Sequence, residues 1–241
     1  MKRELHWNFP LGRPHAGMPL GNGLQGLLVR GEGATLRISI GQAGFWDRRG
    51  GQPFLPEVDY HEVRALLEER DEAGLEAAFG GAKGTPQPHQ IGGGCLELEA
   101  GAGWVLLDGW IDLDEGRITV RWQCGSEERC LRIIQARGAG RSFIHWPEDL
   151  PLESIFLRPS WDWVGTDPAM AGCESPRRWQ TETEWGFLQE LPEDAALAVM
   201  VLRRPEGMAL LSGVGVAVED LRKGGYGLGF AAVEAVSEPF W

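Results

Sequence analysis

Residues 24–40 have the sequence LQGLLVRGEGATLRISI, which predicts two strands joined by a tight turn. In its second half, Leu36, Ile38 and Ile40 alternate with polar residues. Successive side chains of a strand point to opposite faces, so this alternation places one face on a core and the other toward water. We therefore expect a hairpin with strands at residues 24–31 and 34–40.

The same signals continue along the chain. The 35 glycines and 15 prolines spread turn signals over most of its length, as expected for many short strands. Residues 59–79 are the exception, because Val63, Leu66 and Leu67 recur at helical spacing. Gly74 predicts two short helices there, packed on the outside of a sheet. Further strands are expected at residues 95–99, 104–107, 110–113, 117–123, 130–136, 142–146, 153–157, 178–184, 196–203 and 209–218.

This pattern predicts a mainly β fold. We expect a large twisted antiparallel β-sandwich, a supersandwich, with a short helical insertion around residues 57–79. A chain of 241 residues suits one such domain.

Charge and hydropathy exclude several classes of partner. The net charge is −12 and the chain has no basic block, which argues against nucleic acid and anionic membranes as partners. The amino terminus has no apolar stretch after its charges, so we expect no secretory signal and a cytoplasmic location.

Neither the cysteines nor the histidines have metal-ligand spacing, so we expect no metal and no cofactor. Cys124 and Cys130 flank a predicted hairpin turn and could face each other across two strands. In a reducing cytosol they would remain thiols, and the sequence leaves open whether they pair.

Residues 21–26 match the pattern Gly-x-Gly-x-x-Gly. A dinucleotide site needs a strand before this pattern and a helix after it. Here Pro19 and Leu20 precede it and a predicted strand follows, so a nucleotide site is disfavoured. The glycines instead predict a tight turn with exposed amides.

Two tryptophans suggest a possible sugar platform. Trp161 and Trp163 flank Asp162 and would share one face of a strand. Two rings beside a carboxylate can hold a sugar, although two core tryptophans on a buried strand are the favoured alternative. The 35 acidic residues cannot be paired into a catalytic couple from sequence alone.

Several stretches, in this order, resemble the amino-terminal domain of family 95 glycoside hydrolases, the α-fucosidase and α-galactosidase group. Family 65 phosphorylases share the architecture. The resemblance implies a β-sandwich that precedes an (α/α)6 barrel, and it implies that the barrel carries the catalytic acids. The matching stretches are PLGNGLQG at 19–26, the strand that ends in FWDRR at 45–49, LPE at 55–57 with VRALL at 63–67, QIGGGCLEL at 90–98, the hairpin at 108–122 and EPFW at 238–241.

The resemblance also implies domain bounds and site residues. Residues 1–235 would form one sandwich domain, and 236–241 would begin a linker to the barrel. The opening loop would lie near the mouth of the barrel's active site. The candidates for an interface or a sugar-facing edge are therefore Gly21, Asn22, Gly23, Trp46 and Asp47. The alternative is that they only build a tight turn and a core anchor.

The expected function is therefore that of a non-catalytic amino-terminal module of a glycoside hydrolase. Its partner would be the (α/α)6 barrel, as a domain or a separate chain, and no catalytic residue is expected in this chain. One alternative is a free-standing carbohydrate-binding protein that uses Trp161 and Trp163, or Trp46. Another is a structural module that pairs with another chain, including a second copy of itself.

Overall fold

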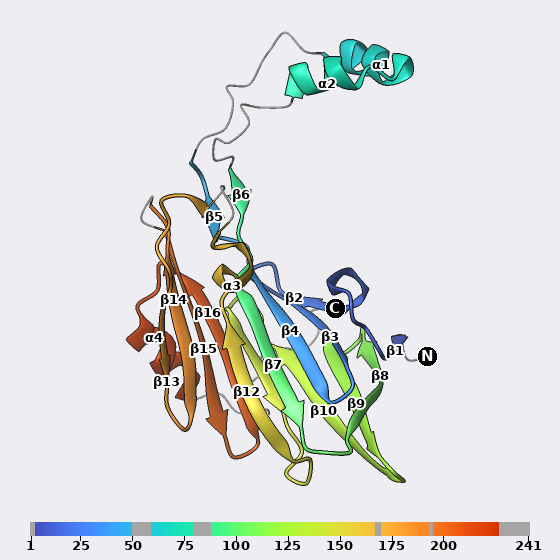
Figure 1. Cartoon of the computed structure of the whole chain (residues 1–241). Helices are drawn as coiled ribbons and strands as arrows, with labels where there is room; N and C mark the ends of the chain where they lie inside the picture. Colours follow the sequence, from blue (N-terminus) through green and yellow to red (C-terminus); the bar gives the residue numbers. More distant parts are fainter. Residues whose placement is uncertain (1–2, 50–58, 80–87, 167–169, 193–194, 227–241) are drawn as a thin grey trace.

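The computed structural model describes residues 3–49, 59–79, 88–166, 170–192 and 195–226. Strands account for 51% of the described residues and helices for 16%, which confirms the mainly β class. Two antiparallel sheets face each other as a sandwich (Figure 1).

Sheet A has nine strands within the described residues. Every neighbouring pair is antiparallel. In spatial order the strands are β1 (Glu4–Asn8), β8 (Val105–Asp112), β9 (Arg117–Cys124), β10 (Glu127–Gln135), β11 (Arg141–His145), β16 (Gly207–Val214), β15 (Ala196–Arg204), β14 (Glu184–Glu190) and β13 (Arg177–Gln180).

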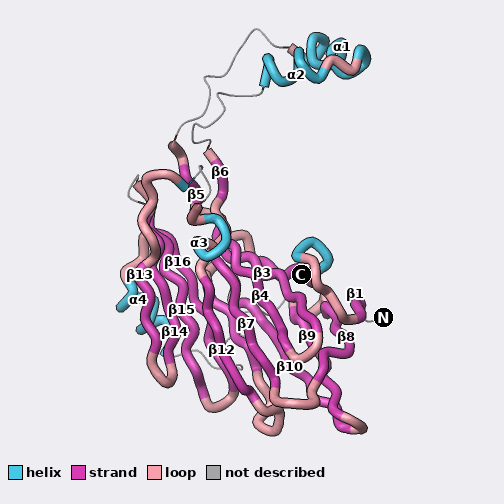
Figure 2. The backbone as a smooth tube through the Cα atoms, viewed as in Figure 1, coloured by secondary structure: helices cyan, strands magenta, loops and turns pink. Residues whose placement is uncertain are grey.

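Sheet B has five strands, and a separate short ladder joins β5 to β6. The helical elements connect or follow these strands (Figure 2). Sheet B runs in the order β12 (Leu152–Arg158), β7 (Gly94–Ala100), β4 (Thr35–Gln42), β3 (Gln25–Glu32) and β2 (Met18–Gly21). The remaining elements are β5 (Trp46–Asp47), β6 (His89–Gln90), the 3-10 turn η1 (Pro14–Ala16), α1 (Tyr60–Glu69), α2 (Glu72–Phe79), α3 (Trp161–Val164) and α4 (Val218–Tyr226).

The main core lies between the sheets. The predicted hairpin is confirmed as β3 and β4, and Leu36, Ile38 and Ile40 are buried as the alternation required. They belong to one apolar cluster with inward residues of sheet A such as Ile118 and Val120. Burial of these side chains is the main stabilising term of the sandwich.

A second apolar cluster lies on the outer face of sheet A. It joins Phe143, Met200 and Leu211 to Leu221 of α4, which covers β15 and β16. The sequence predicted that the last strand continues to residue 218, and this prediction was wrong. The strand ends at Val214 because Gly215 takes a left-handed φ of 67°, and α4 begins at Val218.

The helical insertion forms the two short helices that the sequence predicted. Asp59 caps α1 by accepting a hydrogen bond from the Glu62 amide, and Arg70 ends it in a left-handed conformation with φ 55°. The expectation that the pair packs on a sheet was wrong. The two helices lie apart from both sheets (Figure 1), and α1 buries no residue because its apolar stripe is short.

The cysteine geometry decides a question that the sequence left open. In the β9–β10 hairpin, Cys124 lies opposite Glu127 and Cys130 lies opposite Arg121, so the two thiols do not face each other. Both are free. Burial raises the pKa of the Cys130 thiol.

None of the helices in the described part of the chain is long and apolar enough to span a bilayer. The predicted linker at 236–241 lies outside the described residues.

Candidate functional site

The Gly21–Gly26 segment forms the tight turn that the sequence predicted, between β2 and β3. Gly23 takes a left-handed φ of 86°, which a side chain would disfavour. A strand follows the turn, so the geometry of a dinucleotide site is absent here. The expectation of exposed amides was partly wrong, because Asn22 Oδ1 accepts hydrogen bonds from the amides of Leu24 at 3.0 Å and Gln25 at 2.9 Å.

Asn22 also fastens this turn to the opposite sheet. Its Nδ2 donates to the carbonyl oxygens of Ala136 at 2.6 Å and Ala139 at 2.7 Å. Both acceptors lie in the connection between β10 and β11 of sheet A. One amide side chain thus uses both of its ends, which holds the turn in a single position against the far layer.

A buried polar network lies directly behind the turn. Gln25 is 1% exposed, and its Nε2 donates to Ser212 Oγ at 2.7 Å. Its Oε1 accepts from Ser142 Oγ at 2.6 Å and from Gln135 Nε2 at 3.1 Å. Ser212 Oγ in turn donates to Gln42 Oε1 at 3.1 Å. The network joins the two sheets with polar contacts at the end where the apolar core stops.

Sequence reasoning missed this network, although a signal existed. Each member continues the inward-facing positions of its strand: Gln25 precedes Leu27 and Val29, and Gln135 follows Leu131 and Ile133. A polar residue in step with core positions on several strands marks a buried polar layer.

The turn forms one wall of an open groove of about 470 Å³, which we call the Asn22 groove. The opposite wall is the β8–β9 hairpin at residues 113–116, and Gln135 and Arg137 line the remainder. Gln135 Oε1 is buried without a hydrogen-bond partner among the described residues. Arg137 has no acidic partner in that part of the chain. The groove therefore offers an acceptor and a donor to a partner or ligand.

Both carboxylates of this groove are already paired with arginines. Arg3 Nε donates to Asp114 Oδ1 at 2.7 Å, and Glu115 pairs with Arg117 at 2.5 Å. The hydrogen bond from Arg3 holds the pKa of Asp114 below its ordinary value. Such a carboxylate stays ionised and makes a poor general acid, because glycosidases raise the pKa of their proton donor.

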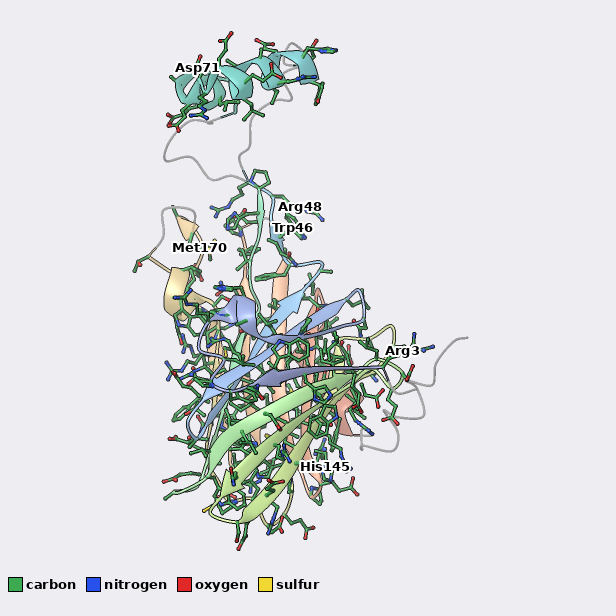
Figure 3. The ribbon with its side chains drawn as sticks, turned by 90° about the vertical axis from the view of Figure 1, so that its right-hand side faces the viewer. Arg3, Trp46, Arg48, Asp71, His145 and Met170 are labelled. Atoms are coloured by element: carbon green, nitrogen blue, oxygen red, sulfur yellow. The ribbon has the colours of Figure 1, made fainter. Side chains whose placement is uncertain are left out.

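Trp46 and Asp47 lie at the same end of the sandwich but outside the Asn22 groove. Trp46 is 42% exposed, so it is not a core anchor, and its Nε1 donates to the carbonyl of Ala43 at 2.7 Å. The Ala43 amide donates to the carbonyl of Leu24, which connects this segment to the turn. Figure 3 shows Trp46 and Arg48 at the end of the sandwich nearest α1 and α2.

Asp47 is buried and serves as an internal ion-pair partner. Arg49 Nη2 lies 2.7 Å from Asp47 Oδ2, and its Nη1 donates to the carbonyl of Ala171. The hydrogen bond from Arg49 lowers the pKa of Asp47. Asp47 therefore fixes the Arg49 guanidinium against a distant loop and is not presented to solvent.

The prediction that Trp161 and Trp163 share a strand face was wrong. Both lie in the single helical turn α3, where residues two apart point in different directions. Trp161 packs against the core, Trp163 is 54% exposed, and Asp162 pairs with Arg178. The alternation of aromatic and polar residues was too short to distinguish a strand from a helical turn. Whether either ring binds sugar stays a prediction.

No cluster of three or more His, Cys, Asp or Glu side chains that could hold a metal ion occurs among the described residues. No model of a known protein family matches the chain, and no curated protein sequence matches it.

Proposed function

We propose that this chain is a non-catalytic amino-terminal module of a glycoside hydrolase of the α-fucosidase and α-galactosidase type. It supports an (α/α)6 catalytic barrel and helps to shape the sugar site of that barrel. The ordered motifs from residue 19 onward support this proposal, together with a β-sandwich that carries its helical insertion between β5 and β6.

The observation that carries the proposal is the anchoring of the opening turn. Asn22 satisfies two amides of its own turn and two carbonyls of the opposite sheet. A loop held in this way presents a preformed edge, and preformed edges cost little conformational entropy when a partner docks. The unpaired Arg137 and the buried Gln135 Oε1 give this edge polar groups for a partner or a sugar.

The non-catalytic part of the proposal rests on the resemblance, which implies that the catalytic acids belong to the barrel. Asp47, Asp114 and Glu184 each accept hydrogen bonds from an arginine, which lowers the pKa of the carboxyl, so none of the three suits the role of proton donor. A glycosidase needs one carboxyl that is still protonated when the sugar binds. In this proposal the barrel supplies that group.

The test begins with the coding sequence beyond the codon for Trp241 and with the neighbouring genes. We expect one of them to encode a helical barrel, and we expect turnover of a nitrophenyl glycoside only when barrel and sandwich are produced together. Asn22→Ala should lower that turnover, whereas Asn8→Ala, on the edge strand β1, should not. A missing barrel, or a barrel that is fully active without the sandwich, would contradict the proposal.

A further inference from the structure

A second groove, of about 380 Å³, lies on the outer face of sheet A. We call it the outer groove. Its lining residues come from β1, β8, β9 and β10, which are neighbouring strands of sheet A (Figure 1). The inward side chains of β8, β9 and β10 belong to the core. The half of this face over β15 and β16 is covered by α4, whereas the outer groove is open. Its main lining residues are His6, Asp108, Trp110, Thr119, Arg121 and Arg132.

The strand register places four of these residues in one row. His6 lies opposite Trp110, Trp110 opposite Thr119, and Thr119 opposite Arg132. Neighbouring strands are about 4.8 Å apart, so the backbones at Trp110 and Arg132 are separated by roughly 10 Å. This distance leaves room for one sugar ring between the indole and the guanidinium.

The aromatic end of the row is held in place by its neighbours. The rings of His6 and Trp110 are stacked, with centroids 6.1 Å apart and planes at 25°. In the adjacent row, Arg121 Nε donates to Asp108 Oδ1 at 3.0 Å, and Arg121 Nη1 donates to Glu128 Oε2 at 3.0 Å. These contacts fix the groove around a half-buried indole.

The other end of the row has unused hydrogen-bonding groups. Thr119 is 4% exposed, yet its hydroxyl has no partner among the described residues. Thr119 lines the groove, so its hydroxyl is available to donate to a bound group. Arg132 is exposed and pairs with no acid in the described part of the chain, unlike Arg121 beside it.

We propose that the outer groove binds a sugar that carries a carboxylate, as in a uronic acid. The apolar face of the pyranose ring stacks on Trp110, and Thr119 donates to a ring or hydroxyl oxygen. Arg132 binds the carboxylate. Its planar guanidinium can donate to both carboxylate oxygens at once, and no acidic side chain is paired with Arg132 among the described residues. In a chain with a net charge of −12, an arginine without an acidic partner beside an indole is the feature that selects an anion.

This site goes beyond the proposed function and does not depend on it. It is formed by different residues from the Asn22 groove, and it needs no barrel. A failure to bind sugar in the outer groove would not change the result expected for the Asn22 groove. A failure of the barrel experiment would likewise not change the result expected for the outer groove.

The experiment titrates the purified chain with digalacturonate and, as the neutral match, with digalactose, followed by calorimetry. We expect binding of the acidic disaccharide and at least tenfold weaker binding of the neutral one, since tenfold corresponds to about 1.4 kcal/mol. Arg132→Gln should remove this preference, whereas Arg177→Gln, the same charge change on β13, should not. Trp110→Ala should weaken binding about tenfold or more. Tyr60→Ala, at an exposed aromatic residue of α1, should leave binding unchanged.

Two further measurements keep the test independent of folding defects. Thr119→Val keeps the shape of the side chain and should weaken binding severalfold. In the unmodified chain, Cys130 lines the groove, so saturating digalacturonate should slow its alkylation while Cys173 reacts at its usual rate.

Three results would overturn the proposal. The first is no binding of digalacturonate, and the second is equal affinity for the two disaccharides. The third is acidic-sugar binding that Arg132→Gln abolishes while Trp110→Ala and Thr119→Val leave it unchanged, because that pattern indicates charge attraction without a ring site.

Discussion

The two grooves of this molecule are built in opposite ways. In the Asn22 groove, the wall turn is tied down and both carboxylates are paired with arginines. In the outer groove, a hydroxyl and a guanidinium of the same row have no partner among the described residues. The grooves therefore differ in what holds their walls: Asn22 fixes the turn of the Asn22 groove against the opposite sheet, whereas the outer groove lies on the strands of a single sheet.

The largest effect on stability is expected behind the Asn22 groove. Gln25→Ala removes three buried side-chain hydrogen bonds, to Ser142, Ser212 and Gln135, and leaves a cavity between the sheets. We therefore expect the free energy of unfolding to fall by about 3 kcal/mol. Chemical denaturation measures this change. The matched control is Gln123→Ala on the outer side of β9, which should stay within about 0.5 kcal/mol of the unmodified chain. Equal losses for both variants would mean that the network adds nothing specific.

Asn22→Ala should have the next largest effect. It removes two bonds within the turn and two to the opposite sheet, and we expect a loss of about 2 kcal/mol. Asn8→Ala is the control, because Asn8 is exposed on β1. Thermal unfolding of the two variants compares them directly. Equal stabilities of Asn22→Ala and Asn8→Ala would contradict the conclusion that Asn22 holds the turn against sheet A.

The third prediction concerns pH and the carboxylate at the Asn22 groove. The hydrogen bond from Arg3 lowers the pKa of Asp114, so this carboxyl should titrate below its ordinary value of 3.8. The contribution of the pair is present above that pH and is lost as the pH falls through the lower, folded-state pKa. Carboxyl-carbon NMR measures the titration, and Arg3→Gln should return it toward the ordinary value. An Asp114 that titrates above its ordinary value would contradict the pairing.

The smallest effects on stability are expected in the outer groove. Arg132→Gln removes no hydrogen bond or ion pair with a described residue and should change stability by less than about 0.5 kcal/mol. Thr119→Val should be neutral or slightly stabilising, because the hydroxyl has no partner to lose. Denaturation curves measure both. A loss of more than about 2 kcal/mol in either variant would show that the row has a structural role instead.

The strands were predictable because alternation is a local signal. Leu36, Ile38 and Ile40 define an inward face without any knowledge of the partner strand. The strand β14 was missed because residues 178–184 showed one continuous pattern, and no glycine or proline marks the turn after Gln180. Helix α4 was missed because its apolar residues follow those of β16 with little interruption.

The candidate site was predictable only in part. The position of Asn22 in a tight turn follows from the glycines around it, but its contacts with Ala136 and Ala139 join residues more than a hundred positions apart. The row from His6 to Arg132 depends on the register of four strands, which no single stretch of sequence contains. Trp161 and Trp163 are the opposite case. Their spacing of two residues predicted a shared strand face, but in the helical turn α3 residues two apart point in different directions.

The most direct test of the non-catalytic module is the hydrolysis of nitrophenyl fucoside and nitrophenyl galactoside by the purified chain alone. We predict no turnover above the uncatalysed rate from acid to alkaline pH, because in the proposed function the catalytic acids belong to the barrel. Turnover that is proportional to protein concentration and specific for one of the two sugars would contradict it.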